Sequence, residues 1–129
     1  MLQSSWVQRD FYASIVDFIG NFERHIYFLP AASNGVLVTG CCHAGIMNTV
    51  QAFRRAVPHI AIRTIVGGLH LCHATDEEIE QTGDFLRQLN LKRLVLLHCT
   101  GEAAGAKLKE MLSCPVEWGS AGLILTCLP

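Results

Sequence analysis

The sequence predicts an α/β fold whose elements follow the order βαβαβαββ after an N-terminal helix. Short apolar runs rich in valine, isoleucine and leucine alternate with longer stretches in which apolar residues recur at helical spacing. Three of the apolar runs end at a histidine, and successive histidines lie about 27 or 28 residues apart, roughly the length of a strand, a crossover helix and the return strand. We therefore expect a parallel sheet with right-handed crossovers.

The first stretch, Phe11 to Leu29, predicts an amphipathic helix, because its phenylalanine and isoleucine residues recur at helical spacing with polar residues between them. Pro30 to Gly35 then indicates a break and a turn, since Asn-Gly is a strong turn dipeptide. We accordingly divide the chain into an N-terminal amphipathic helical segment, residues 1–30, and an α/β region, residues 35–129.

Strands and helices alternate regularly through the α/β region. Pro58 ends the first of its helices, and Thr75 with Glu78 matches a capping box that begins the second. The predicted strands cover about residues 36–39, 60–66, 93–97, 116–118 and 123–128, and the predicted helices about residues 46–57, 75–89 and 104–112.

Composition restricts the classes of protein to consider. The 129 residues are 50% hydrophobic, which is enough to bury the core of one domain. Ten basic and eleven acidic residues give a net charge of −1, so no basic surface indicates binding to nucleic acid or to an anionic membrane. The sequence carries neither a signal-peptide pattern nor a membrane-spanning stretch, and its six cysteines lack the spacing of a disulfide framework. We expect a cytoplasmic protein without a nucleic-acid or membrane partner.

His43, His70 and His98 each stand at or just after the end of a predicted strand. The carboxyl ends of parallel strands meet at one edge of the sheet, where open α/β sheets bind ligands. A single loop histidine more often only hydrogen-bonds the backbone. Three histidines in the same topological position instead favour a metal site, because neutral imidazole is a common zinc ligand and three histidines with an open position suit catalysis. His59 lies away from any strand end, and we assign it no role.

Four cysteines, Cys41, Cys42, Cys72 and Cys99, adjoin these histidines. Thiolate is a strong zinc ligand, so one of them could complete a site. The more common role of such cysteines is that of a small buried hydrophobic residue. A redox role lacks support, since the sequence has no Cys-x-x-Cys pair.

Glycines and a helix start add to the same predicted edge. Gly67 and Gly68 immediately precede a histidine motif, a pattern expected where the backbone closely approaches a ligand, a metal site or another strand. A β-bulge is the simpler alternative. The segment His98 to Gly101 begins a predicted helix, whose free N–H groups could hold a phosphate or carboxylate without any metal.

Three motifs together resemble the C-terminal half of metallo-β-lactamase-fold proteins, in the branch similar to dihydropterin ribofuranosylaminobenzene phosphate synthase. Thr39 to Ile46 resembles the Gly-Cys-Ser-His-x-Gly-Ile segment of that branch. Gly67 to Leu71 resembles its Gly-Gly-Phe-His-Leu segment, and His98 to Gly101 matches its His-Cys-Thr-Gly segment. The resemblance extends from about Gly35 to Gly122.

This resemblance implies one half of an αββα sandwich and a metal-dependent hydrolase or synthase acting on a small-molecule substrate. It implies that His43 and His98 are ligands of zinc or another divalent metal. His70 is implied to lie at the same site as a metal or substrate contact.

The sequence departs from the family in one large respect. Complete members carry an H-x-H-x-D-H motif in their N-terminal half, and these 129 residues contain no such motif. We therefore expect a truncated or divergent product with an incomplete metal site, and the alternative of a non-catalytic metal-binding or assembly half-domain stays open. A lone half would also expose an apolar sheet face. The N-terminal segment, a second copy in a homodimer or a complementary N-terminal half could cover that face.

Overall fold

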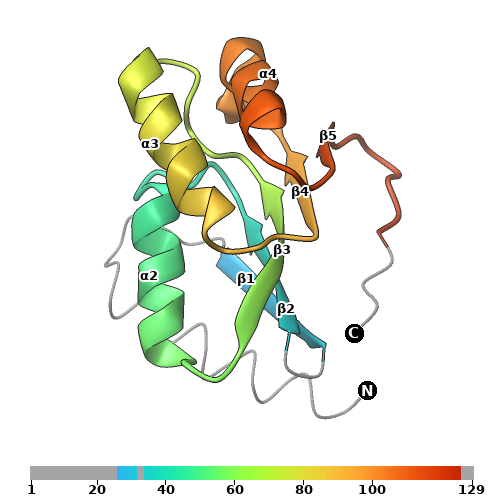
Figure 1. Cartoon of the computed structure of the whole chain (residues 1–129). Coiled ribbons are helices and arrows are strands. Elements are labelled where there is room, and N and C mark those ends of the chain that lie inside the picture. Colours follow the sequence, from blue (N-terminus) through green and yellow to red (C-terminus); the bar gives the residue numbers. More distant parts are fainter. Residues whose placement is uncertain (1–25, 32–33, 126–129) are drawn as a thin grey trace.

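A mixed sheet whose strands lie side by side in chain order organises the structure (Figure 1). The computed structural model describes residues 26–31 and 34–125. The elements in chain order are β1 (Ile26–Ala31), β2 (Asn34–Thr39), α2 (Ile46–Ala56), β3 (Ala61–Gly67), α3 (Asp76–Arg87), β4 (Arg93–Leu96), the 3₁₀ turn η2 (His98–Thr100), α4 (Glu102–Met111) and β5 (Val116–Trp118).

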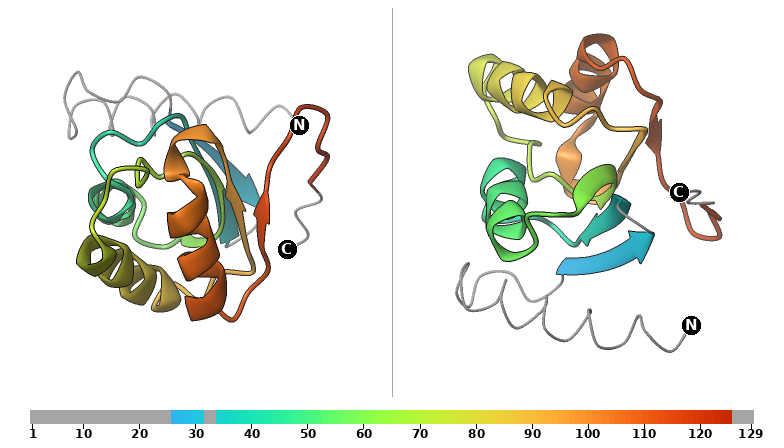
Figure 2. Two further views of the ribbon diagram at one scale, coloured as in Figure 1. Left: turned by 90° about the horizontal axis from the view of Figure 1, so that it is seen from above. Right: turned by 60° about the horizontal axis from the view of Figure 1, so that its bottom comes forward.

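Strands β2 to β5 run parallel, and β1 pairs with β2 in the antiparallel direction. Each parallel strand is added beside the preceding one, so right-handed crossovers place their helices on the same side of the sheet. The three described helices accordingly gather on one face (Figure 2). The predicted α/β class is confirmed. None of the helices in the described ranges is long and apolar enough to cross a membrane.

The predicted N-terminal helix is wrong where the structure describes it. Ile26 to Leu29 belong to β1, in register with Thr39 to Val36 of β2. Pairing with β2, which follows after only two residues in the chain, overrides the helical spacing. The run is also rich in aromatic and β-branched residues, which favour strands. Pro30 is tolerated because β1 is an edge strand. The rest of that helix, residues 11–25, lies outside the described residues, and the domain boundary near residue 30 stays a prediction.

The last predicted strand, residues 123–128, is also wrong in its described part. Residues 121–125 form a turn and irregular chain, in which the Leu123 N–H donates to the Ser120 carbonyl (3.1 Å). Ile124 is 87% exposed, so no neighbouring strand covers it. Residues 126–128 lie outside the described part of the chain.

The core lies between the sheet and its helices. One row of paired residues crosses four strands, Leu37 with Ile65, Ile65 with Leu94 and Leu94 with Val116. All four side chains are buried, and Phe53 of α2 belongs to the same buried cluster. Because side chains alternate along a strand, the next row points to the other face.

That opposite row is also mainly apolar. Val38 pairs with Val66, Val66 with Val95 and Val95 with Glu117. Runs that are apolar on both faces are typical of parallel strands covered on both sides. The sheet therefore offers apolar side chains on the face away from the described helices as well.

Replacing Leu94 with alanine tests the position of the core. Leu94 is completely buried in the middle of the row, so the substitution leaves a cavity, and we expect the free energy of unfolding to fall by about 2–5 kcal/mol in urea denaturation. Lys109→Ala, at an exposed position of α4, is the control and should change it by no more than about 0.5 kcal/mol. Equal stability of both variants would contradict this packing.

Candidate metal centre at the carboxyl edge of the sheet

Three loops leave the sheet at the same edge, because β2, β3 and β4 are parallel neighbours. Backbone hydrogen bonds continue the pairing beyond the strands. Gly68 N–H donates to the Gly40 carbonyl (2.9 Å), and Leu97 N–H donates to the Gly67 carbonyl (3.0 Å). These bonds hold the ends of the three strands together at the start of the loops that carry the predicted site residues.

Left-handed backbone occurs at two non-glycine residues of these loops. Cys42 has a φ of 58° and His70 a φ of 54°, a conformation that costs of order 1–3 kcal/mol and tends to occur at functional sites. The carbonyl of Cys42 accepts a bond from Gly45 N–H (2.9 Å), which closes the turn into α2. As a result Cys42 is fully buried while His43, the next residue, is exposed at the edge.

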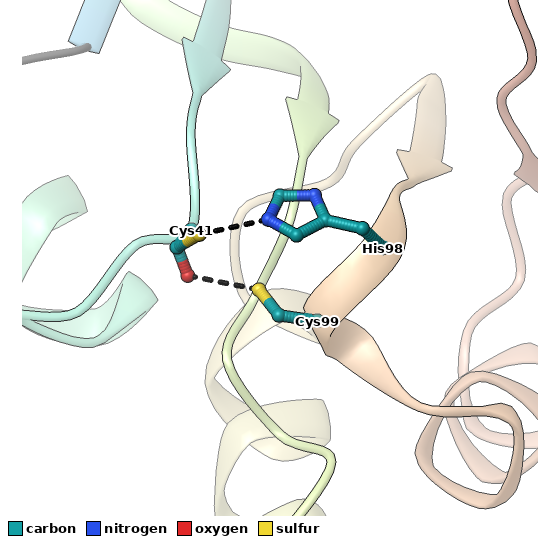
Figure 3. Close-up of side chains that lie close together, drawn as sticks. All are labelled: Cys41, His98 and Cys99. Atoms are coloured by element: carbon teal, nitrogen blue, oxygen red, sulfur yellow. Dashed lines mark hydrogen bonds between the residues drawn. The ribbon is translucent and has the colours of Figure 1, made fainter.

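A cluster of nitrogen and sulfur atoms joins the loops after β2 and β4 (Figure 3). Cys41 Sγ lies 2.8 Å from His98 Nε2, and the Cys99 thiol donates a hydrogen bond to the Cys41 carbonyl at 3.2 Å. The ligand atoms of these three residues all lie within 4.8 Å of one another. His98 is exposed and both cysteines are partly exposed, so the cluster is accessible from solvent.

Gly68 forms one wall of this cluster. A Cβ at this position would lie 2.5 Å from Cys99 Sγ, 2.8 Å from the Gly40 carbonyl oxygen and 3.0 Å from His98 Cε1. Only a residue without a side chain permits these approaches. The close backbone approach expected from the Gly67-Gly68 pair therefore occurs here.

His43 and His70 form a neighbouring pair at the same edge. Their ring centroids lie 4.7 Å apart, with the ring planes inclined at 60°. Both side chains are exposed, and they line a shallow pocket together with residues of α2, Thr82 of α3 and the loop that follows β3.

The structure thus places all three predicted histidines at one edge but divides them between two groups. His98 lies with Cys41 and Cys99, whereas His43 lies beside His70. Among the described residues, the group whose ligand atoms are mutually close does not include His43. Metal ligation by His43 and His98, and a metal or substrate contact by His70, therefore stay predictions.

Sequence reasoning left open which cysteine could complete a site. Both Cys41 and Cys99 lie in the cluster, while Cys42 points into the core near Thr49 and Cys72 is exposed. All four cysteines lie close to a histidine in the sequence, so the sequence did not distinguish the two that lie in the cluster from the two that do not.

Thr100 anchors the loop that carries His98 and Cys99. Its fully buried hydroxyl accepts a bond from Leu69 N–H (3.1 Å) and donates to the Leu97 carbonyl (3.0 Å). In addition, the N–H groups of Leu71 and Cys72 both donate to the Cys99 carbonyl at 3.1 Å. The loops after β3 and β4 are thereby fixed to each other around the cluster.

Burial raises the pKa of the Cys99 thiol above its ordinary value. A hydrogen bond from the His70 backbone lowers this pKa in part, and the nearby Cys41 raises it again. The raised pKa keeps Cys99 protonated near neutral pH while no cation is present. A bound cation would compete with this proton.

This fold is one half of a metallo-β-lactamase-like sandwich, as the sequence predicts, and the chain is related to that superfamily in sequence and structure. A crystal structure described as a metal-dependent hydrolase of the β-lactamase superfamily matches with a TM-score of 0.75 and 30% sequence identity. The match covers 81% of this chain and 40% of that one. No family model matches the sequence.

A particular relative is the 7,8-dihydropterin-6-methyl-4-(beta-D-ribofuranosyl)-aminobenzene-5'-phosphate synthase of Methanocaldococcus jannaschii, which is 31% identical over 108 residues. That alignment covers 83% of this chain and 37% of the synthase. An uncharacterised protein of the same organism is 30% identical over 79 residues, or 61% of this chain and 29% of that protein. The chain thus spans about a third of the length of these curated relatives. The resemblance drawn from the three motifs is confirmed.

Thr100→Val tests the anchor of the site loop. The substitution keeps the shape of the side chain but leaves the buried Leu69 N–H without its hydroxyl partner, which costs about 1–3 kcal/mol. We expect lower stability in urea denaturation and faster hydrogen exchange of the Leu69 amide. Thr100→Ser retains the hydroxyl and should leave that amide protected. Slow exchange at Leu69 in both variants would show that the hydroxyl does not hold the loop.

Proposed function

We propose that this chain supplies part of the metal site of a metal-dependent hydrolase or synthase of the metallo-β-lactamase type. The ligands proposed are His43 and His98, with His70 as a further metal or substrate contact. The supporting observation is the convergence of nitrogen and sulfur donors from the loops after β2 and β4, where Cys41, His98 and Cys99 have ligand atoms within 4.8 Å.

The donor chemistry fits a divalent metal such as zinc. Zinc in proteins is bound by imidazole nitrogen and thiolate sulfur, and catalytic sites use three protein ligands and leave one position open. The edge provides both donor types, on side chains that solvent reaches. A divalent ion bound there would act as a Lewis acid toward an ester-like or phosphoester-like small molecule.

The residues of this chain would position such a substrate. His70 and His43 line the pocket between the site loops and α3, so an imidazole N–H of either ring can donate to an anionic oxygen. The bonds of Thr100 and Gly68 hold the loops in place before substrate arrives, which lowers the cost of ordering them on binding.

A second candidate function is that of a non-catalytic metal-binding or assembly half-domain. The face of the sheet away from the helices favours it. Within the row of paired residues on that face, Val38 and Val66 are partly exposed and would suit packing against a complementary half. A second copy of the chain is the other partner that this row would suit. We also propose a cytoplasmic location, because Cys41, Cys72, Cys99 and Cys114 form no disulfide within the described part of the chain, as expected in a reducing compartment.

Metal analysis of the purified protein tests the ligand assignment. We expect the parent to retain zinc after dialysis and the His43→Ala/His98→Ala double variant to lose it, since imidazole nitrogens provide the binding energy. His59→Ala, an exposed histidine in the turn before β3, is the control and should match the parent. Equal zinc content in the parent and the double variant would contradict the assignment.

Mixing the same protein with a candidate N-terminal half that carries an H-x-H-x-D-H motif separates the two candidate functions. Hydrolysis of an ester or phosphodiester model substrate by the mixture, but by neither component alone, would favour the catalytic role. Stable association without turnover would favour the assembly role.

A further inference from the structure

We propose that Cys41, His98 and Cys99 form a metal site of two thiolates and one imidazole, which binds a thiophilic divalent ion such as Zn²⁺ on this chain alone. The proposal rests on the proposed function for the participation of His98. It adds two sulfur ligands, and it does not require His43.

The separations between the donor atoms suit such a site after small side-chain rotations. Zinc lies about 2.3 Å from sulfur and about 2.0–2.1 Å from nitrogen in tetrahedral sites, which places neighbouring donors roughly 3.6 Å apart. Cys41 Sγ and His98 Nε2 are now 2.8 Å apart, and no pair in the group exceeds 4.8 Å. Each donor therefore moves by about 1 Å or less to enclose an ion at these bond lengths.

The backbone that carries these donors is already fixed. Gly68 N–H joins the Cys41 loop to β3 through the Gly40 carbonyl (2.9 Å), and Leu71 N–H joins the same β3 loop to the Cys99 carbonyl (3.1 Å). The donors come from positions that are far apart in sequence, and the fold brings them together without an ion. The loops are therefore already ordered before an ion binds. The entropic cost of ordering them on binding is small, which favours binding.

Core packing accounts for Cys42 but not for these two cysteines. Cys42 is fully buried and belongs to the hydrophobic cluster, as a structural cysteine usually does. Cys41 and Cys99 are partly exposed, and their polar contacts include each other's residues, His98 and the His70 backbone. Their sulfur atoms lie near one another and near the His98 ring, as metal ligands do, and they do not pack in the hydrophobic core.

The donor set also indicates the class of ion. Soft thiolate sulfur and imidazole nitrogen select zinc and similar ions, whereas magnesium, calcium and manganese prefer oxygen ligands. The group of close donors contains no carboxylate. On binding, each thiol releases its proton to solvent, so the two thiolates balance the charge of the ion and a fourth position stays open.

Cobalt(II) added to the reduced, metal-free chain tests this site directly, because a cobalt–thiolate bond gives a charge-transfer absorption in the near ultraviolet. We expect the band to saturate at one ion per chain, to be displaced by Zn²⁺ and to be unaffected by excess Mg²⁺. Cys41→Ser/Cys99→Ser should lose the band. Cys114→Ser, whose thiol lies before β5 at the opposite edge of the sheet, should retain it.

A second measurement uses only the parent chain and so does not depend on the folding of a variant. One equivalent of Zn²⁺ should protect Cys41 and Cys99 from alkylation by iodoacetamide, read by mass spectrometry, while the exposed Cys72 is modified at an unchanged rate. Equal modification of all three with and without Zn²⁺ would overturn the proposal. A Cys41–Cys99 disulfide that persists in reductant would do the same.

His43→Ala separates this inference from the proposed function. Retention of the cobalt–thiolate band in His43→Ala, with loss in Cys41→Ser/Cys99→Ser, supports the thiolate site. Zinc retention that depends on His43 and not on the two thiols would overturn the thiolate site and leave the proposed function standing. Zinc content equal to the parent in His43→Ala/His98→Ala and in Cys41→Ser/Cys99→Ser would contradict both.

Discussion

The hydrogen bonds that continue strand pairing past the ends of β2, β3 and β4 are the constraint on which the site depends. Gly68 N–H to the Gly40 carbonyl and Leu97 N–H to the Gly67 carbonyl keep adjacent loops at backbone contact distance. The Thr100 hydroxyl adds a buried cross-connection between the second and third of these loops. Without these bonds the imidazoles and thiols would still follow their strands, but the loops that carry them would be held together only by the bonds to the Cys99 carbonyl and the Cys41 carbonyl.

Much of this arrangement could be predicted from the sequence, because it follows from local patterns. Alternating strand and helix periodicity predicts parallel strands, and strands that end in histidines predict histidines at one edge. The capping box at Thr75 and Glu78 occurs as the sequence indicates, with both of its hydrogen bonds formed. These features need only neighbouring residues and the handedness of crossovers.

What could not be predicted depends on strand pairing and on side-chain direction. The helical spacing of Ile26 to Leu29 gives way to antiparallel pairing with β2, although only residues 32 and 33 separate the two strands, because the apolar spacing of so short a run does not distinguish a strand from a helix. The division of the histidines into two groups depends on side-chain direction, which the left-handed backbone at Cys42 and His70 sets. The choice of Cys41 over Cys42 depends on the turn at Cys42, which directs that thiol into the core while Cys41 stays partly exposed at the edge.

The strands lie in the sheet in the same order as in the chain. This order affects how the protein can fold during its synthesis. Each new strand joins an edge that already exists, so no strand must be inserted between two earlier ones. Ribosomal synthesis proceeds from the N-terminus at about 5–20 residues per second. Both groups of side chains at the carboxyl edge lie within residues 40–100. These residues emerge before α4 and β5. A nascent chain can therefore bring the histidines and cysteines of this edge together before α4 and β5 have emerged and packed.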